Sequence, residues 1–162
     1  MLGICYYLSI GMTDISDIKV KIELDNILLI KENITKKALV EKLVRCICEK
    51  NPSLNVEELL AAVLKREEGI STTLESALSI PHARVEDLDT FVGALAVMPK
   101  PIEDDYGLPI KVMFLFFSPA GQPYFVKHLK LLASLSEKFT PEFVQELTTC
   151  TTPQEIAKKV NL

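Results

Sequence analysis

The chain opens with strand-like spacing of its apolar residues. Val20, Ile22 and Leu24 alternate with charged residues, as in a half-buried strand, and residues 27–30 form a short apolar run. We therefore expect an extended segment before the first helix.

Two helices are predicted next. Apolar residues recur every three or four positions over 36–50, and an Asn-Pro pair ends that pattern. Asn55 then offers an N-cap with a carboxylate at the third helical position, and the second helix runs to residues 66–68, before a glycine. Their apolar faces contain Leu39, Leu43 and Ile47 in the first helix and Leu59, Leu60, Val63 and Leu64 in the second.

The second half of the chain predicts central strands followed by helices. Residues 91–98 and 110–117 are apolar runs of strand length, and the polar, proline-rich stretch 99–109 between them is expected to be a loop. Residues 123–138 return to helical spacing, and two Thr-Pro openings place proline at the first position of two further helices, after Thr140 and Thr152. The stripe of the 123–138 helix contains Phe125, Leu129, Leu132 and Leu135.

Strands and helices alternate irregularly, so the expected fold class is α/β, a mixed parallel and antiparallel sheet with helices on both faces. With 162 residues, the chain has the usual size of one domain. We place that domain at residues 14–162. The apolar segment 1–13 is interpreted as an N-terminal extension or tail, or as one more strand; it is too short to span a bilayer and lacks the basic start of a targeting signal.

Composition and charge narrow the possible functions. Hydrophobic residues make up 48% of the chain and charged residues 25%, as in a soluble globular protein. The net charge of -4 and the lack of Lys and Arg clusters interleaved with aromatics argue against a nucleic-acid partner. The four cysteines show no disulfide spacing, so we expect a cytoplasmic protein without direct membrane insertion.

The two histidines, His82 and His128, are the candidate nucleophiles. A neutral imidazole, with an unperturbed pKa of about 6.5, has a lone pair available for phosphoryl transfer. Pro81 places His82 at a strand end or tight turn. From the residues alone, structural roles stay open: a turn histidine at 82 and a boundary histidine on a helix at 128. A metal site with Cys46 and Cys48 is not expected, because residues two apart on a helix point to different sides.

Five short segments follow one another along the chain. They are Arg66-Glu67-Glu68, Ser71-Thr72, Ser79-Ile80-Pro81-His82-Ala83-Arg84, Phe117-Ser118-Pro119-Ala120-Gly121 and His128-Leu129-Lys130-Leu131-Leu132-Ala133. Their order resembles the IIA proteins of the bacterial phosphotransferase system (PTS), of the fructose, mannitol and nitrogen-regulatory type. The resemblance covers roughly residues 24–160 and implies the mannitol-type IIA fold.

By this resemblance, His82 matches the phosphorylated histidine, His128 its supporting second histidine, and Arg66 the active-site arginine. The chemistry agrees, because phosphoryl transfer spreads charge over three oxygens and needs donors and positive charge around an in-line nucleophile. Arg66 offers a planar fork of donors. Its alternative role is an exposed charge at a helix end.

Three further residues are expected around this site. Ser71 and Thr72 would surround the phosphate with hydroxyls or backbone amides, and ordinary turn chemistry is their alternative. Arg84 would face a partner protein, or simply be solvated. The resemblance implies no cofactor and no metal.

The leading function is a phosphoryl carrier, which takes phosphate from the histidine-containing phosphocarrier protein and passes it to a IIB component. The alternative is a nitrogen-regulatory type IIA protein, whose phosphorylation state controls binding to a regulated protein. A third possibility is a member that no longer accepts phosphate. It arises because Thr73, Glu75 and Ala77 stand where relatives tend to have glycines: loss of glycine restricts a loop that needs positive φ, and an inward Glu75 would repel phosphate.

Overall fold

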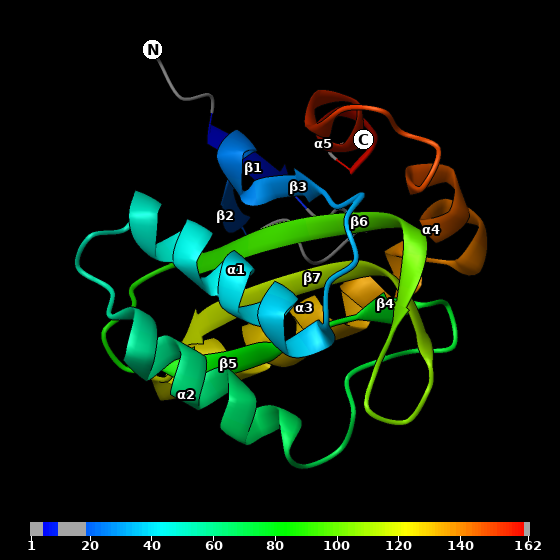
Figure 1. The fold of residues 1–162 in the computed structure, drawn as a ribbon. Coiled ribbons are helices and arrows are strands. Elements are labelled where there is room, and N and C mark those ends of the chain that lie inside the picture. Colours follow the sequence, from blue (N-terminus) through cyan, green and yellow to red (C-terminus); the bar gives the residue numbers. More distant parts are fainter. Residues whose placement is uncertain (1–4, 10–18, 161–162) are drawn as a thin grey trace.

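The computed structural model describes residues 5–9 and 19–160, in which seven strands form one sheet (Figure 1). The strands are β1 (Cys5–Ser9), β2 (Lys19–Glu23), β3 (Ile27–Leu29), β4 (Leu78–Ser79), β5 (His82–Val85), β6 (Phe91–Glu103) and β7 (Pro109–Pro119). Their order is β1-β2-β6-β7-β4, with β3 also beside β6 and β5 also beside β7. Since the pairs are both parallel and antiparallel, the predicted mixed sheet is confirmed.

The two long strands β6 and β7 form the centre of the sheet, as predicted. They pair antiparallel, with Leu95 opposite Phe114. Each carries two short parallel strands along its outer side, β2 and β3 on β6, and β4 and β5 on β7. The break between β4 and β5 falls at Ile80 and Pro81, so His82 is the first residue of β5.

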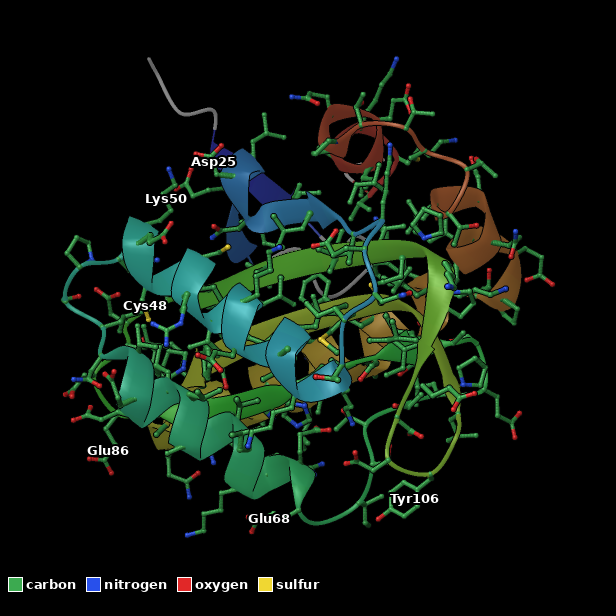
Figure 2. All side chains as sticks on the ribbon, viewed as in Figure 1. Asp25, Cys48, Lys50, Glu68, Glu86 and Tyr106 are labelled. Atoms are coloured by element: carbon green, nitrogen blue, oxygen red, sulfur yellow. The ribbon has the colours of Figure 1, made fainter. Side chains whose placement is uncertain are left out.

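Helices α1 (Lys36–Lys50) and α2 (Val56–Glu67) pack on one face of the sheet. Thr35 and Asn55 cap them, each accepting a hydrogen bond from a backbone N–H three residues further on. At the end of α1, Lys50 Nζ donates to Asp25 Oδ2 at 2.6 Å, on the short 3-10 helix η1 (Leu24–Asn26) (Figure 2). The predicted inner positions of both helices are buried or half-buried.

The opposite face is covered by α3 (Phe125–Lys138), preceded by the 3-10 helix η2 (Gln122–Tyr124), and by α4 (Pro141–Leu147) and α5 (Pro153–Val160). The stripe predicted for α3 is wrong in its first half, because Phe125 and Leu129 are 42% and 50% exposed. The buried residues of α3 are His128, Leu131, Ser134 and Leu135. Apolar residues cover more than one side of this helix, so their period does not single out the inner side.

The stretch 99–109 is mostly strand, contrary to the prediction of a loop. β6 continues to Glu103 and β7 begins at Pro109, and together they form a two-stranded ribbon that is closed by a turn (Figure 1). The register is irregular between Val97 and Ile102, which is where prolines are tolerated because no ladder hydrogen bond is needed. Tyr106, in the turn at the tip of this ribbon, is 73% exposed (Figure 2).

Ala77 has φ 66°, the one positive φ of a non-glycine residue in the described ranges. It is one of the three residues at which the resemblance leads us to expect a glycine. The positive φ expected in this loop is therefore present at Ala77, and an L-residue is strained in this left-handed conformation.

The N-terminal segment is described only over β1, which pairs antiparallel with β2. The boundary between residues 13 and 14 lies outside the described ranges, so the division into 1–13 and 14–162 stays a prediction. No helix in the described ranges is long and apolar enough to cross a bilayer.

Candidate functional site

His82 lies at the break between two short strands, and its ring has one defined proton position. The residue is 5% exposed, and its Nδ1 is 2.7 Å from the carbonyl oxygen of Ile80. A carbonyl oxygen only accepts hydrogen bonds, so the proton of the neutral ring is on Nδ1. Nε2 therefore carries the lone pair; it forms no hydrogen bond within the described part of the chain and is not sealed from solvent.

The inward side of α3 brings His128 next to His82. The two ring centroids are 5.2 Å apart, and both rings lie against Phe116, at 5.4 and 5.5 Å. Phe116 is the partner of His82 across β5 and β7. Two residues further along β7, the buried Ser118 places its Oγ 2.6 Å from His128 Nδ1. Strand β7 therefore supports both imidazoles.

Burial keeps both imidazoles neutral near pH 7. For His82, burial lowers the pKa, and the positive charge of Arg66 lowers it further, against the bond to the backbone carbonyl and the charge of Glu67. For His128, burial lowers the pKa to about 4, with smaller contributions from His82, Arg84 and Arg66. Each ring thus holds one proton and one lone pair.

Arg66 acts on the two histidines electrostatically, and its side chain is exposed. It lies in the last turn of α2, and its Nη1 donates to the carbonyl of Ile70 at 3.2 Å. Arg66 is thus an exposed cation at a helix end, and its charge lowers the pKa of both histidines.

Glu67 is not among the site residues predicted above, yet it connects three segments. Its Oε2 accepts a hydrogen bond from Lys36 Nζ at 2.8 Å, and its Oε1 accepts one from Thr72 Oγ1 at 2.8 Å. The Thr72 carbonyl in turn accepts from the N–H of Ile80, the residue whose carbonyl holds His82. The one signal for Glu67 in the sequence is its place beside Arg66.

The hydroxyls of Ser71 and Thr72 are already paired with carboxylates. Ser71 Oγ donates to Asp104 Oδ2 at 3.1 Å, and Thr72 donates to Glu67. Burial acts to raise the pKa of Asp104, but hydrogen bonds from two backbone N–H groups of the ribbon turn and from Ser71 outweigh it and lower the pKa. In this arrangement the two hydroxyls hold the 70–73 segment in place.

Arg84 is turned towards its own chain. Its Nη2 donates to the carbonyls of Ala120 and Gly121 at 2.6 and 3.3 Å, and its guanidinium carbon is 5.0 Å from the centroid of the Phe125 ring. Arg84 thereby fastens the segment that leads into α3, and with it the helix that carries His128.

Two features considered from the sequence lie apart from the histidines. Glu75 is exposed and is not among the charges that shift the pKa of His82. Cys46 and Cys48 are free thiols on α1, where Figure 2 shows Cys48 towards α2. Within the described residues, no group of three or more His, Cys, Asp or Glu side chains has a metal-binding arrangement.

Helix α3, which carries the buried His128, also has exposed apolar side chains. Phe125, Val126 and Leu129 are 42%, 58% and 50% exposed, on the same turns as the buried His128. A cluster of exposed apolar side chains is typical of a surface that another protein covers.

The fold and this site define an α/β domain with a buried, neutral histidine pair. Residues 21–161 match the family described as "Phosphoenolpyruvate-dependent sugar phosphotransferase system, EIIA 2", and the chain belongs to this family. The resemblance seen in the sequence is thus confirmed.

Curated relatives are nitrogen regulatory proteins. One from Pseudomonas aeruginosa is 22% identical over 104 residues, 63% of this chain and 66% of its own length. One from Bradyrhizobium diazoefficiens is 29% identical over 84 residues, 51% of this chain and 54% of its own length. The matched region thus spans between half and two thirds of these two relatives.

Solved structures share the fold. Nitrogen Regulatory Protein IIA-Ntr from Neisseria meningitidis has a TM-score of 0.74 and 26% identity, and the match covers 85% of this chain and 94% of that one. IIA mannitol from Escherichia coli has a TM-score of 0.70 and 17% identity, with 86% and 99% covered. The predicted mannitol-type IIA fold is therefore confirmed.

Proposed function

We propose that this protein is a PTS phosphoryl carrier in which His82 accepts the phosphoryl group from the phosphorylated histidine-containing phosphocarrier protein. The observation that carries the proposal is the state of His82: a neutral imidazole, with Nδ1–H held by the Ile80 carbonyl and the Nε2 lone pair accessible. Such a ring is a nucleophile that needs no base to activate it.

The transfer step balances without a co-reactant. The Nε2 lone pair of His82 forms the new N–P bond, while the P–N bond of the donor breaks and its electron pair returns to the donor ring. The Nδ1 proton of His82 stays on Nδ1, at the Ile80 carbonyl. Transfer to an acceptor is the same exchange, with His82 as the leaving group.

The surroundings suit the charge that develops on the phosphoryl oxygens. Arg66 supplies a positive charge that lowers the pKa of both histidines, and its planar guanidinium offers several donors to phosphoryl oxygens. The apolar surface of Phe125, Val126 and Leu129 offers a docking face beside the site. We propose that Ser71 and Thr72 shape the phosphate side of the site through their loop, and that Arg84 presents the α3 docking face to the partner.

For the next acceptor we propose a IIB component. A solved structure is the complex of enzyme IIAMTL and phosphorylated enzyme IIBMTL from Escherichia coli. Its match to this chain has a TM-score of 0.67 and 17% identity. We place the carrier domain at residues 14–162 and the protein in the cytoplasm.

The second candidate is a nitrogen-regulatory protein whose affinity for a regulated protein changes when His82 is phosphorylated. The names of the curated relatives and of the Neisseria meningitidis structure favour it. Phosphate adds charge of about -2 beside an apolar docking surface, which changes the partners that this surface fits.

The test is phosphorylation by the purified, phosphorylated histidine-containing phosphocarrier protein, followed by intact mass. We expect one acid-labile phosphate on the wild type and on His128→Ala, and none on His82→Ala. No phosphate on the wild type, or phosphate on His82→Ala, would overturn the proposal.

A second assay separates the two candidates. The isolated phosphoprotein is mixed with a IIB component, and loss of phosphate from His82 is followed by mass. Transfer to the IIB component supports the carrier, whereas retention of phosphate, together with a partner bound in only one phosphorylation state, supports the regulator.

A further inference from the structure

The buried pair of Ser118 and His128 is not used by the mechanism above. Ser118 is fully buried on β7, and His128 is 6% exposed. Their Oγ and Nδ1 atoms are 2.6 Å apart. In the described part of the chain, the Ser118 hydroxyl has no other hydrogen-bond partner.

Counting protons gives this hydrogen bond a direction. If Nδ1 of His128 carried the proton and donated it, the hydroxyl hydrogen of Ser118 would be buried without an acceptor. An unpaired buried donor is costly, whereas a hydroxyl that donates to a bare Nδ1 satisfies both groups. The ring proton of the neutral His128 is then on Nε2.

We propose that Ser118 is a positioning residue that holds His128 as the Nε2–H tautomer, opposite to the Nδ1–H tautomer of His82. The catalytic consequence rests on the proposed function: a bare Nε2 on His82 receives the phosphoryl group, and an Nε2–H on His128 donates a hydrogen bond to one of its oxygens. The ring centroids are 5.2 Å apart and the ring planes are tilted by 58°, so the two imidazoles are direct neighbours.

A histidine of the other tautomer would act against the transfer. With a proton on Nδ1, His128 would present a lone pair on Nε2 towards an anionic group, which repels it. Preorganised donors are effective because they need no rearrangement when charge develops. The backbone carbonyl at Ile80 and the hydroxyl of Ser118 thus select opposite nitrogens on the two rings.

The tautomers are measured directly by 15N NMR of the histidine rings at pH 7.5, through couplings from the ring protons to both nitrogens. The chain has only two histidines, so His82→Gln and His128→Gln assign the signals. We expect a protonated Nδ1 on His82 and a protonated Nε2 on His128. A His128 ring protonated mainly on Nδ1 overturns the proposal.

Ser118→Ala removes the hydroxyl, and Ser118→Thr keeps it. In Ser118→Ala we expect a mixture of tautomers at His128 and a roughly tenfold slower phosphorylation of His82, as for the loss of one orienting hydrogen bond to a reacting group. Ser118→Thr should restore both. The matched control is Ser134→Ala, which removes a buried hydroxyl on α3 that donates to the Lys130 carbonyl. It should leave the tautomer and the rate unchanged.

The outcomes separate this proposal from the proposed function. An unchanged tautomer and rate in Ser118→Ala, with the backbone spectrum of a folded protein, overturns the role of Ser118. If neither the wild type nor any variant accepts phosphate, but the tautomers change as expected, the carrier function is wrong and the assignment of Ser118 stands.

Discussion

The depressed pKa of His128 makes the stability of this protein depend on pH in a window where few other groups titrate. Burial lowers the pKa of this histidine in the folded state from 6.5 to about 4. The unfolded chain therefore binds a proton at this position more readily than the folded protein. The stabilising contribution is fully present above pH 6.5 and is lost as the pH falls towards 4.

The magnitude follows from the two pKa values. At about pH 5 the histidine of the unfolded chain is about 1.5 pH units below its pKa and is protonated, while the folded ring stays mostly neutral. Lowering the pH from about 7.5 to 5 therefore reduces the free energy of unfolding by about 2 kcal/mol. His82 adds a loss of the same sign. Burial is the main cause of the lowered pKa of His82, so we expect this loss in the variant without His128 as well.

Urea unfolding of the wild type and of His128→Gln, at pH 7.5, 6.5, 5.5 and 5.0, isolates this contribution. A glutamine does not titrate, and its amide oxygen accepts from Ser118 in place of the ring nitrogen. We expect the wild type to lose about 2 kcal/mol more than the variant over this range. Equal losses in the two proteins would refute a folded-state pKa near 4.

Two further predictions concern stability. Glu67→Ala leaves the Lys36 ammonium without its carboxylate partner; the Glu67 and Lys36 side chains are only 10% and 11% exposed. We expect urea unfolding to show a decrease of about 3 kcal/mol in the free energy of unfolding. Glu41→Ala, which removes an exposed helical ion pair, should cost far less, and similar costs would contradict the importance of burial. Ala77→Gly relieves a left-handed alanine, which costs about 1–2 kcal/mol. We therefore expect Ala77→Gly to be less destabilising by that amount than Ala96→Gly, which changes an alanine in the regular strand β6. Thermal and urea unfolding measure both variants, and equal stabilities would contradict strain at Ala77.

Helix boundaries were predictable because they depend on residues close together in the chain. The helix expected over 36–50 has these bounds in the structure, and Thr35, Asn55 and Thr140 each accept a capping bond three residues on. Capping groups and the helices they begin are neighbours in sequence, so the local pattern contains the needed information.

The ribbon at 99–109 and the inner side of α3 were not predictable in this way. Prolines at 99, 101 and 109 are typical of a loop, and only the pairing of β6 with β7 shows that the strands continue around them. On α3, Phe125 and Leu129 are as apolar as the buried Leu131 and Leu135. The packing of the helix on β7 decides which of them face the core.

For the candidate site too, some features follow from the sequence and others only from the tertiary structure. The order of the short segments along the chain, through the resemblance to the PTS IIA family, makes His82, His128 and Arg66 the candidate site residues from the sequence. The proton positions on the two rings come from an Ile80 carbonyl two residues from His82 and from Ser118, ten residues before His128. The depressed pKa values come from burial beneath α3 against β7. Covalent order specifies which groups are present, whereas tautomer and pKa depend on which atoms are within a few ångströms, and this depends on the packed tertiary structure.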